Sequence, residues 1–255
     1  MGDEVHLFCA GGTIAVDASL AAMARPRVHV AAFTVAPAGP PLLTIRRTPG
    51  LQGQALDTPL GQATVRLQGD LLELDLAADG PFPGELALRL GYYLVASRQG
   101  GLLLHACALA LGPDAVVACG KSGDGKSTLA RLGRAAGLTL LTDEVVQLFP
   151  DGRVAGTPFR SDADNVGSPG VARVRYFLTL VKADQEALAP LPAMEAASVA
   201  LAQAFDVEAF GLPPAELRRR LLGFLGVVQL GALRFRKHPG AGAFVRGLLG
   251  PSSPG

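Results

Sequence analysis

The sequence predicts a mixed α/β fold (α+β), in which a β-rich N-terminal region precedes a domain built around a glycine-rich loop. Two observations support this prediction. Short apolar or alternating runs separated by Gly, Pro and Asp fill residues 4–100, which is typical of β-rich segments. From residue 101 onward, strand-like runs alternate with helical ones, and one strand leads into a glycine-rich motif. We therefore divide the 255 residues into a β-rich N-terminal region packed by a helix, 1–100, and a second domain, 101–255.

The N-terminal region should contain five strands and one helix. Residues 63–67 and 71–76 alternate on either side of Gly69-Asp70 and should form a hairpin. A helix is expected over 84–98, where large apolar residues recur at helical spacing, and it should pack on the sheet. The other strands are predicted at 5–9, 28–35 and 43–46. We find no concentration of catalytic residue types in this region.

The second domain begins with an apolar run, 102–111, that turns at Gly112-Pro113-Asp114 into a strand over 115–119, which predicts another hairpin. A helix over 127–136 and a strand over 138–142 follow, as in a β-loop-α-β unit with a right-handed crossover. Beyond them the pattern predicts a hairpin from 145–149 and 153–155, strands at 174–181 and 232–236, and helices at 194–205 and 213–225.

Residues 120–128 fit the pattern G-x-x-x-x-G-K-S/T and lie between a predicted strand and a predicted helix. Glycines in such a loop let backbone N–H groups turn inward, and the helix that follows adds its positive end, so a phosphate chain can be held there. Lys126 would reach the β- and γ-phosphates, and Ser127 would ligate Mg²⁺. The alternative is a glycine-rich turn without a ligand. The predicted nucleotide-binding residues are Gly120, Ser122, Gly123, Asp124, Gly125, Lys126, Ser127 and Thr128.

Asp143 and Glu144 end the strand that follows the loop, 17 residues or more after Lys126. Acidic side chains at the carboxyl end of such a strand are placed for Mg²⁺ coordination or general-base chemistry, although a turn carboxylate or a helix cap is the alternative. His105 is the only titratable residue of the run 102–111, and a lone histidine in an apolar strand is more often a hydrogen-bonded core residue than a catalytic one, so both roles stay open.

Arg160 lies in the polar segment 156–167, which has no periodicity and is a candidate lid or substrate loop. Its guanidinium could stabilise charge on a transferring phosphoryl group. A solvated loop arginine is the alternative.

The strand around His105, the loop at 120–128 and Leu141-Thr142-Asp143-Glu144 together resemble the core of the HPr serine kinase/phosphorylase superfamily, over residues 101 to about 160. The resemblance implies a P-loop kinase core in which Lys126 and Ser127 bind ATP and Mg²⁺ and Asp143 deprotonates an acceptor hydroxyl. It also implies that His105 lies near the phosphate and that Glu144 assists at the metal. The catalytic set would be Asp143, His105, Lys126 and Arg160, with Ser127, Asp143 and Glu144 at the metal.

The chain departs from that family in two places. Glu144 stands where the bifunctional enzymes have Asp, and their Arg-Pro-Gly-Arg-Asn segment, associated with phosphorolysis, is not found. A kinase-only relative is therefore implied, similar to shorter HPr-kinase-related proteins that accompany pathways for modified peptides. The expected acceptor is a hydroxyl on a peptide or small protein. A nucleotide-dependent scaffold or switch, or a small-molecule kinase, is the alternative.

The composition argues against several other classes of function. With 49% hydrophobic and 18% charged residues and a net charge of +1, the chain carries no footprint of nucleic-acid binding. Neither a signal-peptide core nor an apolar run of about 18 residues is found, so we expect a cytoplasmic protein without membrane partners. The three cysteines have no metal-site spacing and are expected to be buried thiols. The oligomeric state stays open, a homo-oligomer included.

Overall fold

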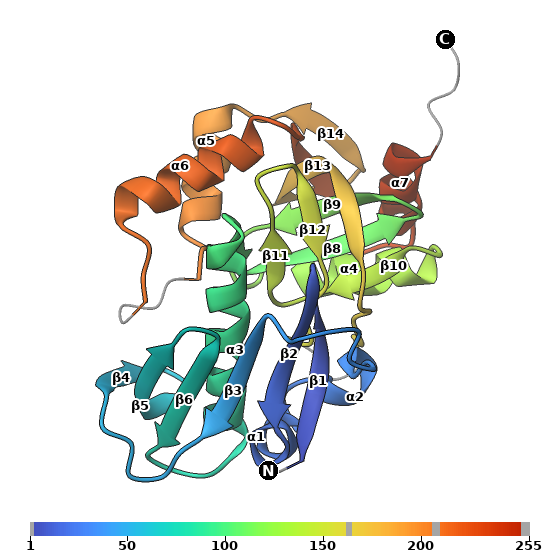
Figure 1. Cartoon of the computed structure of the whole chain (residues 1–255). Helices are drawn as coiled ribbons and strands as arrows, with labels where there is room; N and C mark the ends of the chain where they lie inside the picture. Colours follow the sequence, from blue (N-terminus) through green and yellow to red (C-terminus); the bar gives the residue numbers. More distant parts are fainter. Residues whose placement is uncertain (1–2, 162–164, 206–209, 251–255) are drawn as a thin grey trace.

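A computed structural model describes residues 3–161, 165–205 and 210–250. These residues form two mixed β-sheets and seven helices, which confirms the mixed α/β class. Figure 1 shows the N-terminal sheet below the larger C-terminal sheet, with helix α3 (Pro81–Arg98) running between them. Within the described part of the chain, no helix is both long and apolar enough to cross a membrane.

The N-terminal sheet has six strands in the order β1-β2-β3-β6-β5-β4. Its predicted hairpin is confirmed as an antiparallel pair, in which alternation turns Val65 and Leu74 toward the core and Arg66 and Glu73 toward the other face. The elements of this region are β1 (Glu4–Cys9), β2 (Gly12–Asp17), α1 (Ala18–Ala24), α2 (Val30–Phe33), β3 (Leu43–Arg47), β4 (Gln54–Thr58), β5 (Gly61–Gln68), β6 (Leu71–Leu76) and α3.

Helix α3 confirms the helix predicted over 84–98 and begins three residues earlier. It buries 13 of its 18 residues because it contacts both sheets rather than one. Two glycines allow this close packing. A Cβ at Gly91 would lie 2.3 Å from Ile45 Cδ1, and one at Gly84 would lie 2.6 Å from the backbone nitrogen of Ala24.

The prediction for the N-terminal region is wrong at 28–35. These apolar and β-branched residues favour a strand, but they contain helix α2, because backbone contacts with residues 158–159 fix the segment in another conformation. The sequence analysis also missed β2, α1 and β4. Helix α1 carried a local signal, since the Asp17 side chain caps it by accepting from the Ser19 amide at 2.8 Å.

The C-terminal sheet follows the path β10-β8-β9-β13-β12-β11-β7, with β15 beside β13 and β14 beside β15. Helices α4 and α7 pack on one face, and α5 and α6 pack on the other. Burial on both faces explains why the runs 106–111 and 115–119 are continuously apolar. The elements are β7 (Leu102–Leu104), β8 (Ala106–Leu111), β9 (Asp114–Cys119), α4 (Lys126–Ala135), β10 (Thr139–Thr142), β11 (Val146–Leu148), β12 (Arg153–Ala155), β13 (Val171–Lys182), β14 (Ala187–Pro190), α5 (Ala193–Leu201), α6 (Pro214–Leu225), β15 (Gln229–Phe235) and α7 (Gly240–Leu249).

The hairpin of β8 and β9 is confirmed, but the run 102–111 is not one strand. It breaks at His105, where the backbone N–H bonds with Gln203 O, so that β7 pairs with β11 and β8 pairs with β9. The β-loop-α-β unit is confirmed as β9, the loop, α4 and β10, but its two strands are not neighbours, because β8 lies between them and is antiparallel to both. The predicted helix over 194–205 ends at Leu201, and β14 and α7 were missed.

The cysteines are free and buried, as expected from their apolar surroundings. Burial raises the pKa of Cys9 and of Cys119 to about 12, and it raises the pKa of Cys107 further. These thiols are therefore protonated at neutral pH and behave as small apolar side chains.

Candidate active site

Strand direction brings the predicted site residues to one edge of the C-terminal sheet. Strand β8 runs antiparallel to both β9 and β10, so its beginning lies beside the ends of the other two. His105 precedes β8, the glycine-rich loop follows β9, and Asp143 follows β10. They meet in a cleft of about 310 Å³ lined by His105, Ser122, Gly123, Gly125, Lys126, Ser127, Thr128, Asp143, Glu144 and Ser161.

The loop has the backbone conformation that its glycines permit. Gly123 has φ of +87° and Gly125 has φ of +109°, which disfavour any other residue. A Cβ at Gly125 would also lie 2.8 Å from Phe235 Cζ. Asp124 braces the loop, because its Oδ2 accepts from the Lys121 amide at 2.6 Å. Helix α4 then begins at Lys126, so its N-terminus points into the cleft.

Lys126 folds back over the loop. Its Nζ donates to Gly120 O at 2.7 Å and to Lys121 O at 3.2 Å, and the residue is only 6% exposed. Burial lowers the pKa of the ammonium below its usual value, although nearby acidic groups such as Glu144 partly oppose this. An anion in the loop would give this buried cation a stronger partner than the two carbonyls.

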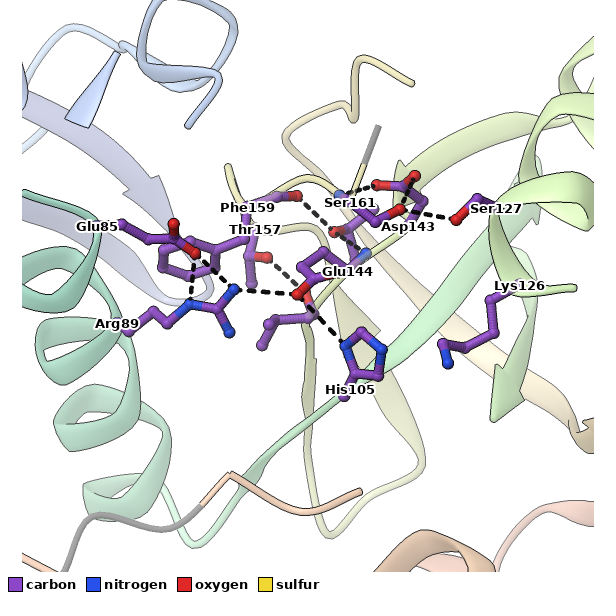
Figure 2. A network of polar contacts seen from close by, with 12 residues as sticks. Glu85, Arg89, His105, Lys126, Ser127, Asp143, Glu144, Thr157, Phe159 and Ser161 are labelled. Carbon is purple, nitrogen blue, oxygen red and sulfur yellow. Dashed lines mark hydrogen bonds and ion pairs between the residues drawn. The ribbon is translucent and has the colours of Figure 1, made fainter. Parts of the chain in front are cut away.

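Asp143 is fully buried and receives hydrogen bonds on both carboxylate oxygens. Oδ1 accepts from the Ser161 amide at 3.1 Å, and Oδ2 accepts from Ser161 Oγ at 2.7 Å and from Asn165 Nδ2 at 2.8 Å. Ser161 Oγ also lies 2.8 Å from Ser127 Oγ. Figure 2 shows this serine between the loop and the acid.

The sequence analysis missed Ser161 and Asn165 as site residues. Both lie in the polar segment 156–167, which has neither periodicity nor a motif, so nothing in the sequence indicated that these two residues belong to a site. Residues 162–164 of that segment lie outside the described residues.

Glu144 points away from Asp143 into a chain of ion pairs (Figure 2). Its Oε1 lies 3.1 Å from Arg89 Nη2 and 3.5 Å from His105 Nδ1. Arg89 also pairs with the buried Glu85 at 2.6 Å, and Glu85 pairs with Arg27. Burial by itself would raise the pKa of Glu144, but the His105 and Arg89 contacts outweigh it and lower that pKa below its usual value.

Helix α3 thus contributes charged residues that support the cleft from outside its lining, through the pair of Arg89 with Glu144, although no catalytic residue types stood out in the N-terminal region. Glu85 is 1% exposed and Arg89 is 9% exposed. Their spacing on the helix did not indicate a role near the site, because a Glu-x-x-x-Arg pair is typical of an exposed helix surface.

The segment that carries Ser161 is anchored on the N-terminal region. Three contacts do this: the β-bridge between Val28 and Phe159, the bond from His29 N to Pro158 O, and the bond from the Arg160 guanidinium to Pro26 O. Arg160 is not among the residues that line the cleft. The structure therefore groups His105, Lys126, Ser127, Asp143 and Glu144, and it gives Arg160 a contact with the turn that follows helix α1 in the N-terminal region.

A larger hollow of about 730 Å³ lies on the N-terminal sheet, among strands β4, β5 and β6. Its lining includes Asp57 and Asp75 but neither a basic side chain nor a glycine loop. An anionic phosphate chain would be repelled there, so we place the candidate site in the smaller cleft.

No protein-family model matches the chain, and no curated protein is significantly similar to it. The site therefore has to be interpreted from its own chemistry. Among the described residues, no group of three or more His, Cys, Asp or Glu side chains could hold a metal ion by itself. The cleft offers instead a glycine-rich loop and a helix N-terminus beside the oxygens of Ser127, Asp143 and Ser161, an arrangement that would suit a metal ion bound together with phosphate groups.

Proposed function

We propose that the protein is an ATP-dependent kinase that transfers a phosphoryl group to a serine-type hydroxyl of a peptide or small protein, with a P-loop core of HPr-kinase type. The observation that carries the proposal is the common cleft of the glycine-rich loop, Asp143 and His105. A loop alone would support only nucleotide binding. A buried carboxylate at the same edge adds a group that can accept a proton from the acceptor.

The residues present fit ATP and Mg²⁺. Backbone N–H groups of the loop and the start of α4 would hold the phosphates, with Lys126 as the counter-charge. Ser127 and Asp143 offer the hard oxygen ligands that Mg²⁺ prefers. When bound, the metal would neutralise charge on the phosphates.

Asp143 is suited to the role of general base. It already accepts a hydrogen bond from a serine hydroxyl at 2.7 Å, which is the contact that an acceptor hydroxyl would need. In the proposed reaction the acceptor oxygen bonds to the γ-phosphorus, the bond from that phosphorus to the β,γ-bridging oxygen breaks, and the acceptor proton passes to Asp143. ADP and the phosphorylated product leave.

The acceptor class rests on the family resemblance, and a cytoplasmic location is part of the same proposal. Cytoplasm supplies ATP and keeps thiols reduced, which agrees with three free, buried cysteines. The resemblance to kinases that accompany modified-peptide pathways points to a serine in a peptide.

The test is incubation of the purified protein with γ-labelled ATP, Mg²⁺ and a panel of serine-containing peptides, followed by mass spectrometry of the products. Phosphoserine formation that is lost in Lys126→Met supports the proposal. Nucleotide binding with neither hydrolysis nor transfer across a wide panel would indicate a scaffold or switch. Transfer confined to small hydroxyl compounds would indicate a small-molecule kinase.

A further inference from the structure

The hydroxyl of Ser161 lies where a cation shared by the loop and the acid would need a ligand. Its Oγ is 2.8 Å from Ser127 Oγ and 2.7 Å from Asp143 Oδ2. Glu144, the residue expected to assist at the metal, instead directs its Oε1 to Arg89 and His105. Ser161 is thus the group that connects the two expected metal ligands.

These distances match the coordination geometry of Mg²⁺. Octahedral Mg²⁺ holds oxygens at about 2.0–2.1 Å, so neighbouring ligands around it are about 2.8–3.0 Å apart. The two contacts of Ser161 Oγ fall within about 0.3 Å of that separation. A cation could therefore bind these oxygens with little movement of the oxygens themselves, while both serine hydroxyls keep their protons and turn them away from the cation.

We propose that Ser161 is a third protein ligand of the divalent-cation site, together with Ser127 and Asp143. The inference rests on the proposed function, because that function supplies the cation and the nucleotide. The three side chains carry one negative charge in all, from Asp143. Mg²⁺ usually binds through one or two carboxylates plus substrate phosphates, so the site holds the cation with a nucleotide and only weakly without one.

The fold fixes Ser161 from two sides. Asn165 donates to Asp143 Oδ2 and keeps the carboxylate in place. On the other side, Thr142 Oγ1 donates to Phe159 O at 3.1 Å, and Phe159 forms a β-bridge with Val28. The N-terminal region is in this way part of the support of the cation site.

The test measures cation binding instead of catalysis. Mn²⁺ binding in the presence of ADP is followed by electron paramagnetic resonance for the wild-type protein, Ser161→Ala and Ser168→Ala. Ser168 lies seven residues further along the chain, directly after that segment, and is not among the residues that line the cleft. Ser161→Ala should weaken Mn²⁺ binding by at least about tenfold, the lower end of what loss of a supporting group costs a metal site. Ser168→Ala should bind like wild type.

Ser161→Cys adds a direct signature. A thiol at this position should restore binding of the thiophilic ion Cd²⁺ with ADP and give a thiolate-to-metal absorption band in the ultraviolet. Wild type and Ser161→Ala, which keep the same three buried cysteines, should give no such band. Circular dichroism confirms that each variant is folded.

Two results overturn the inference and leave the kinase proposal standing: Mn²⁺ affinity of Ser161→Ala within about twofold of wild type, or tighter than wild type. Tighter binding would mean that the hydroxyl blocks the cation. If the wild-type protein binds no Mn²⁺ with ADP, the proposed function fails as well, because Ser161 then has no cation to hold.

Discussion

Replacing Asp143 with asparagine should separate its chemical role from its structural one. The side chain is fully buried and faces three donors: the Ser161 amide, the Ser161 hydroxyl and Asn165 Nδ2. An amide of the same size can accept on one oxygen only. Its NH₂ group must then face at least one of these donors, so the variant loses hydrogen bonds as well as the charge.

The expected loss of stability follows from the number of hydrogen bonds that the variant loses. Leaving a buried donor unsatisfied costs about 1–3 kcal/mol, and hydrogen bonds to a charged group lie at the upper end. For a chain of this size each kcal/mol lowers the melting temperature by roughly 2–4 °C. The rate of phosphoryl transfer should fall by at least about a hundredfold even while the variant is folded, because a positioned general base accelerates a reaction by about 10²–10⁴-fold.

Asn165, which donates to Asp143 Oδ2, offers a matched control. In the double variant Asp143→Asn/Asn165→Asp, the new amide at 143 can donate to the new carboxylate at 165, so the hydrogen bond and the net charge are both retained. The Ser161 hydroxyl can rotate and accept from the amide. We expect this variant to recover most of the lost stability without recovering transfer.

Three measurements on each variant decide the matter: denaturant unfolding for stability, titration calorimetry for ADP, and transfer of labelled phosphate to peptide. ADP binding should persist in Asp143→Asn, since the loop and Lys126 are untouched. Transfer within about tenfold of wild type, with either variant, would refute Asp143 as the base. Recovery of transfer in the double variant would mean that the hydrogen-bond network matters and that the position of the carboxylate does not.

Three further predictions concern the loop and the contact with α3. Lys126→Met should weaken ATP binding by at least about tenfold in calorimetry, because it removes the buried cation of the loop. Gly125→Ala should cost about 1–3 kcal/mol in a denaturant melt, since φ is +109° and a Cβ would lie 2.8 Å from Phe235. Arg89→Met should cost about 3 kcal/mol. The lowered pKa of Glu144 makes its stabilisation complete above pH 4.5 and lost at lower pH, so the melting temperature of Arg89→Met should vary less with acid pH.

The loop and its surroundings could be predicted because the information is local. Gly123 and Gly125 take positive φ, as the motif requires, and the residue that follows opens α4. The strand before the loop is apolar and buried from Ala115 to Cys119, as expected for a strand covered on both faces, and the strand before Asp143 places two buried leucines between threonines. The turn at Gly112-Pro113-Asp114 also predicts that β8 is antiparallel to β9, which brings His105 to the edge of the sheet that carries the loop. The insertion of β8 between β9 and β10 is encoded by no local pattern.

Ser161 and Asn165 illustrate a second limit. Neither residue type has a spacing rule that marks it as a ligand, and both lie in a segment without periodicity. Their positions depend on a backbone path that crosses β10 closely. A Cβ at Gly156 would lie 2.3 Å from Ser168 O, and one at Gly167 would lie 2.6 Å from Leu141 O. The glycines of this polar segment allow the close path, but glycines are equally typical of an ordinary loop, so they did not predict it.

The N-terminal region is harder still to connect with the site from sequence, because the connection is made of ion pairs between distant residues. Glu85 at 1% exposure is a carboxylate that folding would not bury without Arg89 and Arg27. Arg89 in turn reaches Glu144 and so fixes the carboxylate beside His105. Deleting residues 1–100 would remove both the arginine and the strand partner of Phe159. The cleft would then keep its glycine-rich loop but lose the Arg89 contact with Glu144 and the Val28 bridge to Phe159. The N-terminal region is therefore a structural part of the candidate site.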